Sequence, residues 1–72
     1  MLVKIIELIL KDWNYTEKFI KDENFEPGYL PLIGDILYKG NKCYKVEERR
    51  IHLSSYNESP YFELIVKFKH YV

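Results

Sequence analysis

The sequence predicts a mainly β protein, built as a small five-stranded, strongly bent sheet or barrel with a long aromatic-rich connection after the first strand. Alanine, the best helix former, is absent, whereas β-branched and aromatic residues are frequent. The stretch Tyr61–Val72 alternates apolar and polar side chains with the period of two that a strand requires. Two apolar runs also flank Gly40-Asn41, which is the pattern of a β-hairpin.

The length and composition bound the architecture. Seventy-two residues suffice for one domain, so we expect residues 1–72 to form a single small β domain. The chain is 47% hydrophobic and 17% aromatic, which is more than a disordered segment carries. A domain of this size buries only about 60% of its unfolded surface, which leaves little room for a deep substrate pocket.

The first element, residues 2–11, is predicted to be a strand. Val3, Ile5 and Ile9 are β-branched, although Lys4, Glu7 and Lys11 also have helical spacing, so a helix stays open as the alternative. As a strand it would be apolar on both faces. It would therefore need cover from the rest of the chain or from a second subunit.

Residues 12–31 are predicted to be a long connection because their apolar periodicity fades. Thr16–Ile20 could form a short strand or a helical turn within it, and Glu26-Pro-Gly-Tyr29 has the residue order of a type II turn. Its aromatic residues are expected to cover the open face of the first strand: Trp13, Tyr15, Phe19, Phe25 and Tyr29.

The second half of the chain is predicted to form a hairpin followed by a bulged strand. Gly40 suits the first position of a type II′ turn, which sets Leu37 opposite Tyr44 and Tyr38 opposite Cys43. The parity of apolar residues then changes, so a bulge near Glu48 is expected to return Ile51 and Leu53 to the core.

The last strand has the clearest alternation and completes the set of elements. Ile65 falls on its outward face, and the expected inward row is Phe62, Leu64, Val66, Phe68, His70 and Val72. A tight hairpin, a bulged long strand and a Gly-Asp entry turn over residues 31–70 are together similar to a small SH3-like barrel. This is a similarity to a pattern of elements, and it transfers no functional residues.

The residues that could carry chemistry predict no catalytic site, no cofactor and no metal site. Gly28, Gly34 and Gly40 are too scattered to form a phosphate-binding loop. His52 and His70 do not obviously converge, and Cys43 with either histidine lacks signs of an activated thiol. Glu47 and Glu48 are adjacent on a strand, so they favour surface ion pairing over a shared acid–base or metal site.

A lone cysteine and the absence of a long apolar run indicate a cytoplasmic location. Cys43 has no second thiol for a disulfide, which favours a reducing compartment. No stretch approaches the roughly 18 apolar residues of a membrane span. The richness in Lys, Ile, Tyr and Asn is typical of AT-rich coding, which suggests an accessory protein of a low-GC bacterium, phage or mobile element.

The leading functional hypothesis is a non-catalytic protein-interaction or assembly module, whose partner is another protein or a second copy of the chain. The doubly apolar first strand and the aromatic residues after it exceed what a small domain needs for its own core. The candidate interface consists of Val3, Ile5, Ile9, Trp13 and Tyr15.

The alternative is a nucleic-acid-binding β-barrel. The chain has no net charge, but residues 1–36 carry −3 and residues 37–72 carry +3. Lysines and arginines interleaved with tyrosines in the second half are the combination that holds single-stranded nucleic acid. The candidate face consists of Tyr38, Lys45, Arg49, Arg50, Lys67, Lys69 and Tyr71.

Overall fold

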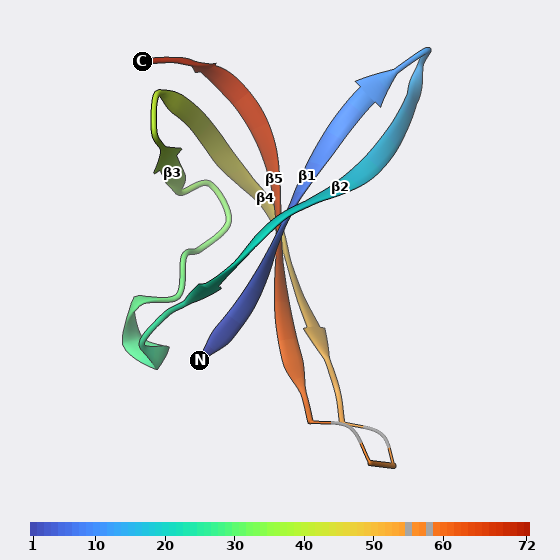
Figure 1. The fold of residues 1–72 in the computed structure, drawn as a ribbon, viewed down its shortest axis with the longest axis vertical. Coiled ribbons are helices and arrows are strands. Elements are labelled where there is room, and N and C mark those ends of the chain that lie inside the picture. Colours follow the sequence, from blue (N-terminus) through green and yellow to red (C-terminus); the bar gives the residue numbers. More distant parts are fainter. Residues whose placement is uncertain (55, 58) are drawn as a thin grey trace.

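The computed structural model describes residues 1–54, 56, 57 and 59–72, and these form one mixed five-stranded sheet (Figure 1). The mainly β, five-stranded prediction is therefore confirmed. The strand order is β2-β1-β5-β4-β3, with β1 and β5 parallel and the other pairs antiparallel. The elements are β1 (Leu2–Lys11), β2 (Asn14–Asn24), the 3₁₀ helix η1 (Pro27–Tyr29), β3 (Ile36–Lys39), β4 (Lys42–His52) and β5 (Tyr61–Tyr71).

The prediction of a strand at residues 2–11 is confirmed, but that of a long connection from residue 12 is wrong. β2 pairs with β1 from Lys11 opposite Asn14 to Leu2 opposite Asn24, so residues 16–20 lie in the middle of a long strand. β2 is an edge strand whose side chains are mostly exposed. It therefore lacks the apolar alternation by which a half-buried strand is recognised.

The parallel pair β1 and β5 forms the centre of the sheet, which explains why β1 is apolar on both faces. Leu64, Ile65 and Val66 are consecutive and all fully buried. Because successive strand side chains point to opposite faces, β5 is covered on both faces at its middle. The prediction that Ile65 lies on the face opposite Leu64 and Val66 is therefore confirmed, but this side chain is buried because that face is covered at the middle of β5. We call the face bearing Leu64 and Val66 the core face, and that bearing Ile65 the outer face.

The Gly40-Asn41 hairpin is confirmed with the predicted register, Leu37 opposite Tyr44 and Tyr38 opposite Cys43. Gly40 has φ +60° and Asn41 does not adopt a positive φ, as a type II′ turn requires.

The turn at Glu26-Pro27-Gly28-Tyr29 differs from the prediction. A type II turn needs a positive φ at Gly28, but this glycine is not in that region and residues 27–29 form η1 instead. The Tyr29 amide donates to the Glu26 carbonyl at 2.9 Å and closes the turn.

A register shift between Val46 and Glu48 confirms the predicted bulge in β4, but not its predicted effect. Ile51 and Leu53 remain 59% and 83% exposed, so their assignment to the core is wrong. The physical reason is that β3 pairs only with Lys42–Lys45. The rest of β4 therefore has no neighbouring strand at its edge away from β5.

A second register shift, between Cys43 and Tyr44, interrupts the inward row of β5. The prediction that His70 and Val72 face inward is wrong. The shift places His70 opposite Cys43 with its side chain exposed, and Val72 is 77% exposed. The predicted row thus ends before His70.

The hydrophobic core lies on the core face and consists of Val3, Tyr44, Val46, Leu64 and Val66. The chain between β2 and β3 covers it through Phe25 and Leu30, and further half-buried side chains pack against it: Met1, Ile5, Ile20, Leu37 and Phe62. Backbone hydrogen bonds of 2.9 Å join Gly34 and Asp35 to Val46. These bonds hold the connection against β4.

The two edge strands, β2 and β3, do not pair with each other, so the sheet is not closed into a barrel. The SH3-like barrel prediction is not confirmed. Figure 1 shows that the β1–β2 hairpin instead extends away from the β3–β4 hairpin, and its tip projects from the body of the molecule.

Candidate functional site

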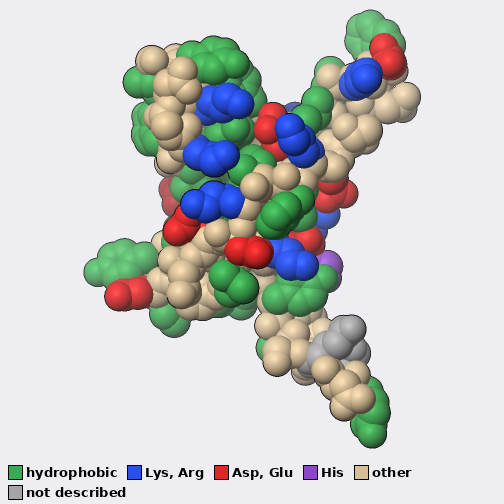
Figure 2. Space-filling view, viewed as in Figure 1, with side chains coloured by type: hydrophobic (Ala, Val, Ile, Leu, Met, Phe, Trp, Pro, Cys, Tyr) green, Lys and Arg blue, Asp and Glu red, His purple; other side chains and the backbone are tan. Residues whose placement is uncertain are grey.

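The tip of the β1–β2 hairpin presents the chain's only tryptophan to solvent. Asp12 and Trp13 join the two strands with φ values of +52° and +67°, the pair of left-handed residues that a type I′ turn requires. The Asn14 side-chain amide donates to the Asp12 carbonyl at 3.3 Å. Trp13 is 91% exposed, and Figure 2 shows hydrophobic, acidic and basic side chains meeting at this tip.

Three further apolar side chains continue from the tip along the outer face of the hairpin. Leu10 is directly opposite Tyr15, and Phe19 is directly opposite Ile6, whose side chain is buried. Directly opposed residues share a face of the sheet. We call Leu10, Trp13, Tyr15 and Phe19 the hairpin patch; the exposed fractions of Leu10, Tyr15 and Phe19 are 55%, 54% and 55%.

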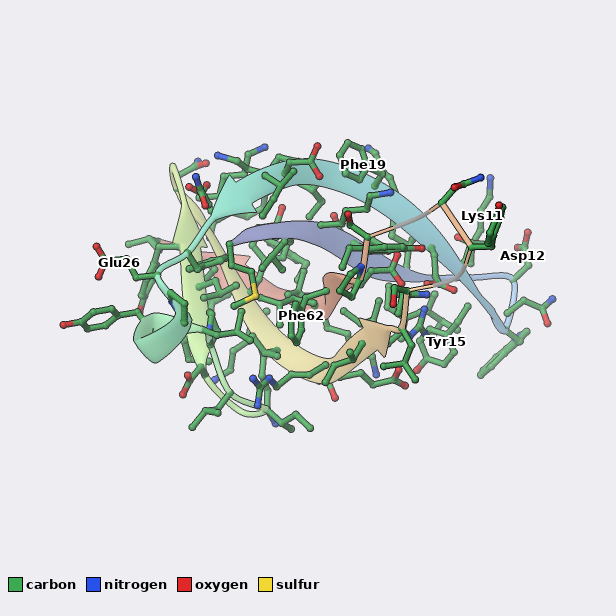
Figure 3. The ribbon with its side chains drawn as sticks, turned by 90° about the horizontal axis from the view of Figure 1, so that it is seen from below. Lys11, Asp12, Tyr15, Phe19, Glu26 and Phe62 are labelled. Carbon is green, nitrogen blue, oxygen red and sulfur yellow. The ribbon has the colours of Figure 1, made fainter. Side chains whose placement is uncertain are left out.

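Phe19 of the hairpin patch lies apart from the hydrophobic core. Figure 3 shows Phe19 pointing away from the body of the molecule, whereas Phe62 lies in its interior. Tyr15 has a partner on the sheet, because the Lys67 ammonium lies 4.8 Å from its ring centroid and 3.4 Å from its hydroxyl. Tyr15 is thereby held while its remaining surface stays accessible.

Of the five residues predicted as a protein interface, the structure exposes two. Trp13 and Tyr15 lie in the hairpin patch, whereas Val3 is fully buried, Ile5 packs against the core and Ile9 is half-buried. The prediction omits Leu10 and Phe19. Their exposure follows from the pairing of β1 with β2, and no local pattern in the sequence signals that pairing.

A groove of about 430 Å³ opens on the core face between the edge strands β2 and β3. We call it the β2–β3 groove. Tyr44 and Val66 are core residues that also line it, together with Ile20 of β2 and Leu37 of β3. Its lining is completed by Ile5, Lys21, Glu23, Phe25, Ile36, Tyr38 and Lys39.

The charges at the groove are set by two lysines and a glutamate. Lys21 Nζ lies 2.7 Å from Glu23 Oε2, and the hydrogen bond and positive charge of Lys21 hold the pKa of Glu23 below its ordinary value. A lowered carboxyl pKa stabilises the fold only while the carboxyl is ionised, so this contribution is lost as the pH falls through the folded pKa. Lys39 lies opposite Lys42 across the hairpin and, among the described residues, has no carboxylate within 4.0 Å.

The residues predicted as a nucleic-acid face do not form one surface. Arg49 and Arg50 follow each other on β4 and point to opposite faces. Lys45 is opposite Lys67 on the outer face, Tyr38 lies on the edge strand β3, and the end of β5 carries Lys69 and Tyr71.

Arg50 is committed to ion pairs within the fold. Its guanidinium lies 2.6 Å from Glu17 and 3.0 Å from Glu48, and the hydrogen bonds that it donates to these carboxylates raise its pKa. Glu17 is on β2 and Arg50 on β4, so the side chain spans the two central strands on the outer face. This placement covers the side of β5 on which Ile65 is buried.

The cysteine and the two histidines do not gather in one cleft. His70 is opposite Cys43, but Cys43 is buried and the His70 Nδ1 lies 3.0 Å from the Tyr71 carbonyl oxygen. His52 is at the far end of β4, where it stacks on Tyr61 at 4.3 Å between ring centroids and contacts the Glu63 carboxylate.

Neither a metal cluster among the described residues nor a known relative identifies a function. Within residues 1–54, 56, 57 and 59–72, no three His, Cys, Asp or Glu side chains are grouped to hold a metal ion. In the same part of the chain, no helix has the length and apolar character needed to cross a bilayer. No family model, curated protein or solved structure matches this chain.

Proposed function

We propose that this chain is a non-catalytic protein-interaction or assembly module that docks through its β1–β2 hairpin. The observation that carries the proposal is Trp13, which is 91% exposed at the projecting tip. Tryptophan and tyrosine are enriched among the few residues that dominate binding energy at protein interfaces. A tip of this kind delivers a large apolar side chain to a partner.

The backbone of the tip supports the same conclusion. Asp12 and Trp13 both adopt left-handed conformations, although neither is glycine. Aspartate tolerates such a conformation, but it costs a residue such as tryptophan about 1–2 kcal/mol, and backbone outliers that persist tend to cluster at functional sites. A turn selected only for stability would carry Asn-Gly here.

The wider hairpin patch gives the docking surface its extent. Leu10, Tyr15 and Phe19 are each about half exposed and share the outer face of the hairpin, Leu10 and Tyr15 near the tip and Phe19 farther along β2. Exposed apolar side chains accompanied by charged groups are typical of protein-binding surfaces. Glu17 lies between Tyr15 and Phe19 on this face, and the Lys67 ammonium contacts Tyr15.

A catalytic role has less support. Cys43, the one thiol, is buried, and His52 is already engaged by Tyr61 and Glu63. We place the protein in a reducing, cytoplasmic setting, as its single free cysteine suggests.

The proposal is tested by photo-crosslinking from Leu10 in cells that express the protein. A photoreactive side chain at this position should give a discrete adduct with a protein, and Trp13→Gly should abolish that adduct. Tyr56→Ala is the matched control, because Tyr56 is 93% exposed outside the hairpin. An adduct that survives Trp13→Gly, or no discrete adduct at all, would overturn the proposal.

Trp13→Gly also separates docking from folding. Glycine adopts a positive φ without strain, so the variant should unfold at the same or higher urea concentration than the wild-type chain. A loss of binding without a loss of stability would then reflect the missing indole.

A gel shift with single-stranded oligonucleotides at low salt should show no binding. Salt-sensitive binding that charge reversal at Arg49 and Lys67 abolishes would favour the nucleic-acid alternative.

A further inference from the structure

The β2–β3 groove reaches one side of the hydrophobic core. Core residues Tyr44 and Val66 line it, while Ile20 and Leu37 stand on strands that have no neighbour on their outer sides. Protein interiors are otherwise packed as densely as organic crystals. A groove of about 430 Å³ that reaches the core of an 8.8 kDa chain is therefore suited to an apolar side chain supplied from outside.

Trp13 is the large apolar side chain that the fold leaves unpacked, but it cannot fill the groove of its own chain. Ile20, which lines the groove, lies seven positions after Trp13 along the extended strand β2. At about 3.3 Å per residue this is roughly 23 Å, and the paired strand β1 holds the hairpin extended. The indole can reach such a groove only on another molecule.

One acidic side chain beside Trp13 is complementary to one basic side chain at the groove. Asp12 precedes Trp13 at the tip, and among the described residues it has no cation within 4.0 Å. Lys39 lines the groove and lies next to Lys42, a like-charged neighbour that an incoming carboxylate would offset. The tip belongs to the half of the chain with charge −3, and β3 and β4 lie almost wholly in the half with +3.

We propose that the partner is a second copy of this chain, whose Trp13 inserts into the β2–β3 groove while its Asp12 pairs with Lys39. This inference rests on the proposed docking function of the hairpin and names its partner. The contact joins two different surfaces, so it is heterologous: it extends into a chain of molecules, or it closes when two copies exchange tips. Because the contact is confined to the tip and is therefore small, we expect the association to be weak and to depend on protein concentration.

Two variants with intact folds test the inference by complementation. Trp13→Gly removes the indole at the tip and leaves the groove unchanged. Lys39→Glu reverses the charge of one groove residue and leaves the tip unchanged. Lys39 is exposed and opposes Lys42, so the glutamate replaces a like-charged pair with an opposite-charged one and should not destabilise the fold. In sedimentation velocity we expect Trp13→Gly to stay monomeric and Lys39→Glu to self-associate at least tenfold more weakly than wild type.

Mixing the two variants should restore one contact, because the tip of Lys39→Glu can enter the groove of Trp13→Gly. The expected product is a 1:1 complex that does not grow further. Since Trp13 is the only tryptophan, its emission reports its burial directly. Adding non-fluorescent Trp13→Gly to Lys39→Glu should shift that emission to shorter wavelength, while the double variant should leave it unchanged.

The charge pair has its own check. Asp12→Lys combined with Lys39→Glu in one chain should recover the self-association that either change alone weakens. Wild-type protein that stays monomeric up to about 1 mM, or Trp13→Gly that associates as wild type does, would overturn the inference. If the wild type is monomeric but Leu10 still crosslinks to a different protein in a Trp13-dependent way, only the choice of partner fails and the docking function stands.

Discussion

Leu64 and Leu53 are the same residue type in the C-terminal half of the chain, yet their exposed fractions are 1% and 83%. Leu64 lies on the central strand β5 and belongs to the core cluster. Leu53 follows the end of β4, beyond the reach of β3. Apolar character alone places both residues in the core, and only the neighbouring strands decide which of them is covered.

This difference predicts unequal costs of truncation. Leu64→Ala should lower the free energy of unfolding by about 2–5 kcal/mol, because it leaves a cavity in a packed core. Leu53→Ala should change it by less than about 0.5 kcal/mol, as is usual for exposed positions. Urea unfolding followed by circular dichroism measures both. Equal effects of the two substitutions would contradict the placement of the core.

Among the elements, the Gly40-Asn41 turn is the most predictable feature and the edge strand β2 is the least. Gly40-Asn41 specifies a two-residue hairpin through the backbone freedom of glycine, and the structure confirms its register. The turn at Asp12-Trp13 has no glycine, so the sequence does not indicate its left-handed geometry. β2 escapes prediction for a related reason, since an edge strand with exposed faces needs no apolar alternation.

Gly40 and Gly28 form a matched pair for testing turn geometry. A Cβ atom at either position would meet open space, but only Gly40 has a positive φ, +60°. Gly40→Ala should therefore lower the free energy of unfolding by about 1–2 kcal/mol through backbone strain. Gly28→Ala should be neutral or slightly stabilising, because it restricts the unfolded chain. Chemical denaturation checks both values, and an unstrained Gly40→Ala would exclude the type II′ turn.

Across the molecule as a whole, the strand order sets a gradient of stability. β5 and β1 have neighbours on both sides and contain the fully buried Val3, Leu64, Ile65 and Val66. β2 and β3 have one neighbour each. The sheet is thus anchored at its centre, and both proposed contact surfaces, the hairpin patch and the β2–β3 groove, involve its edges.

Hydrogen exchange should reveal this gradient. In monomeric Trp13→Gly, amides of residues 62–66 on β5 should exchange most slowly, because their opening requires unfolding of the sheet. Amides on the unpaired side of β2 should exchange fastest among the strands. Protection of β2 equal to that of β5 in the monomer would contradict the strand order β2-β1-β5-β4-β3.

Local patterns in the chain suffice to predict the mainly β class, the first strand, the Gly40-Asn41 hairpin, the bulge near Glu48 and the location of the last strand. These patterns are side-chain alternation, glycine conformation and changes of parity, whereas Trp13 and Tyr15 are singled out by the surplus of aromatic residues. The parallel pairing of β1 with β5, the edge position of β2 and the exposure of Ile51 and Leu53 emerge only in three dimensions. The same is true of the groove, because burial and cavities arise between strands that are distant in the chain.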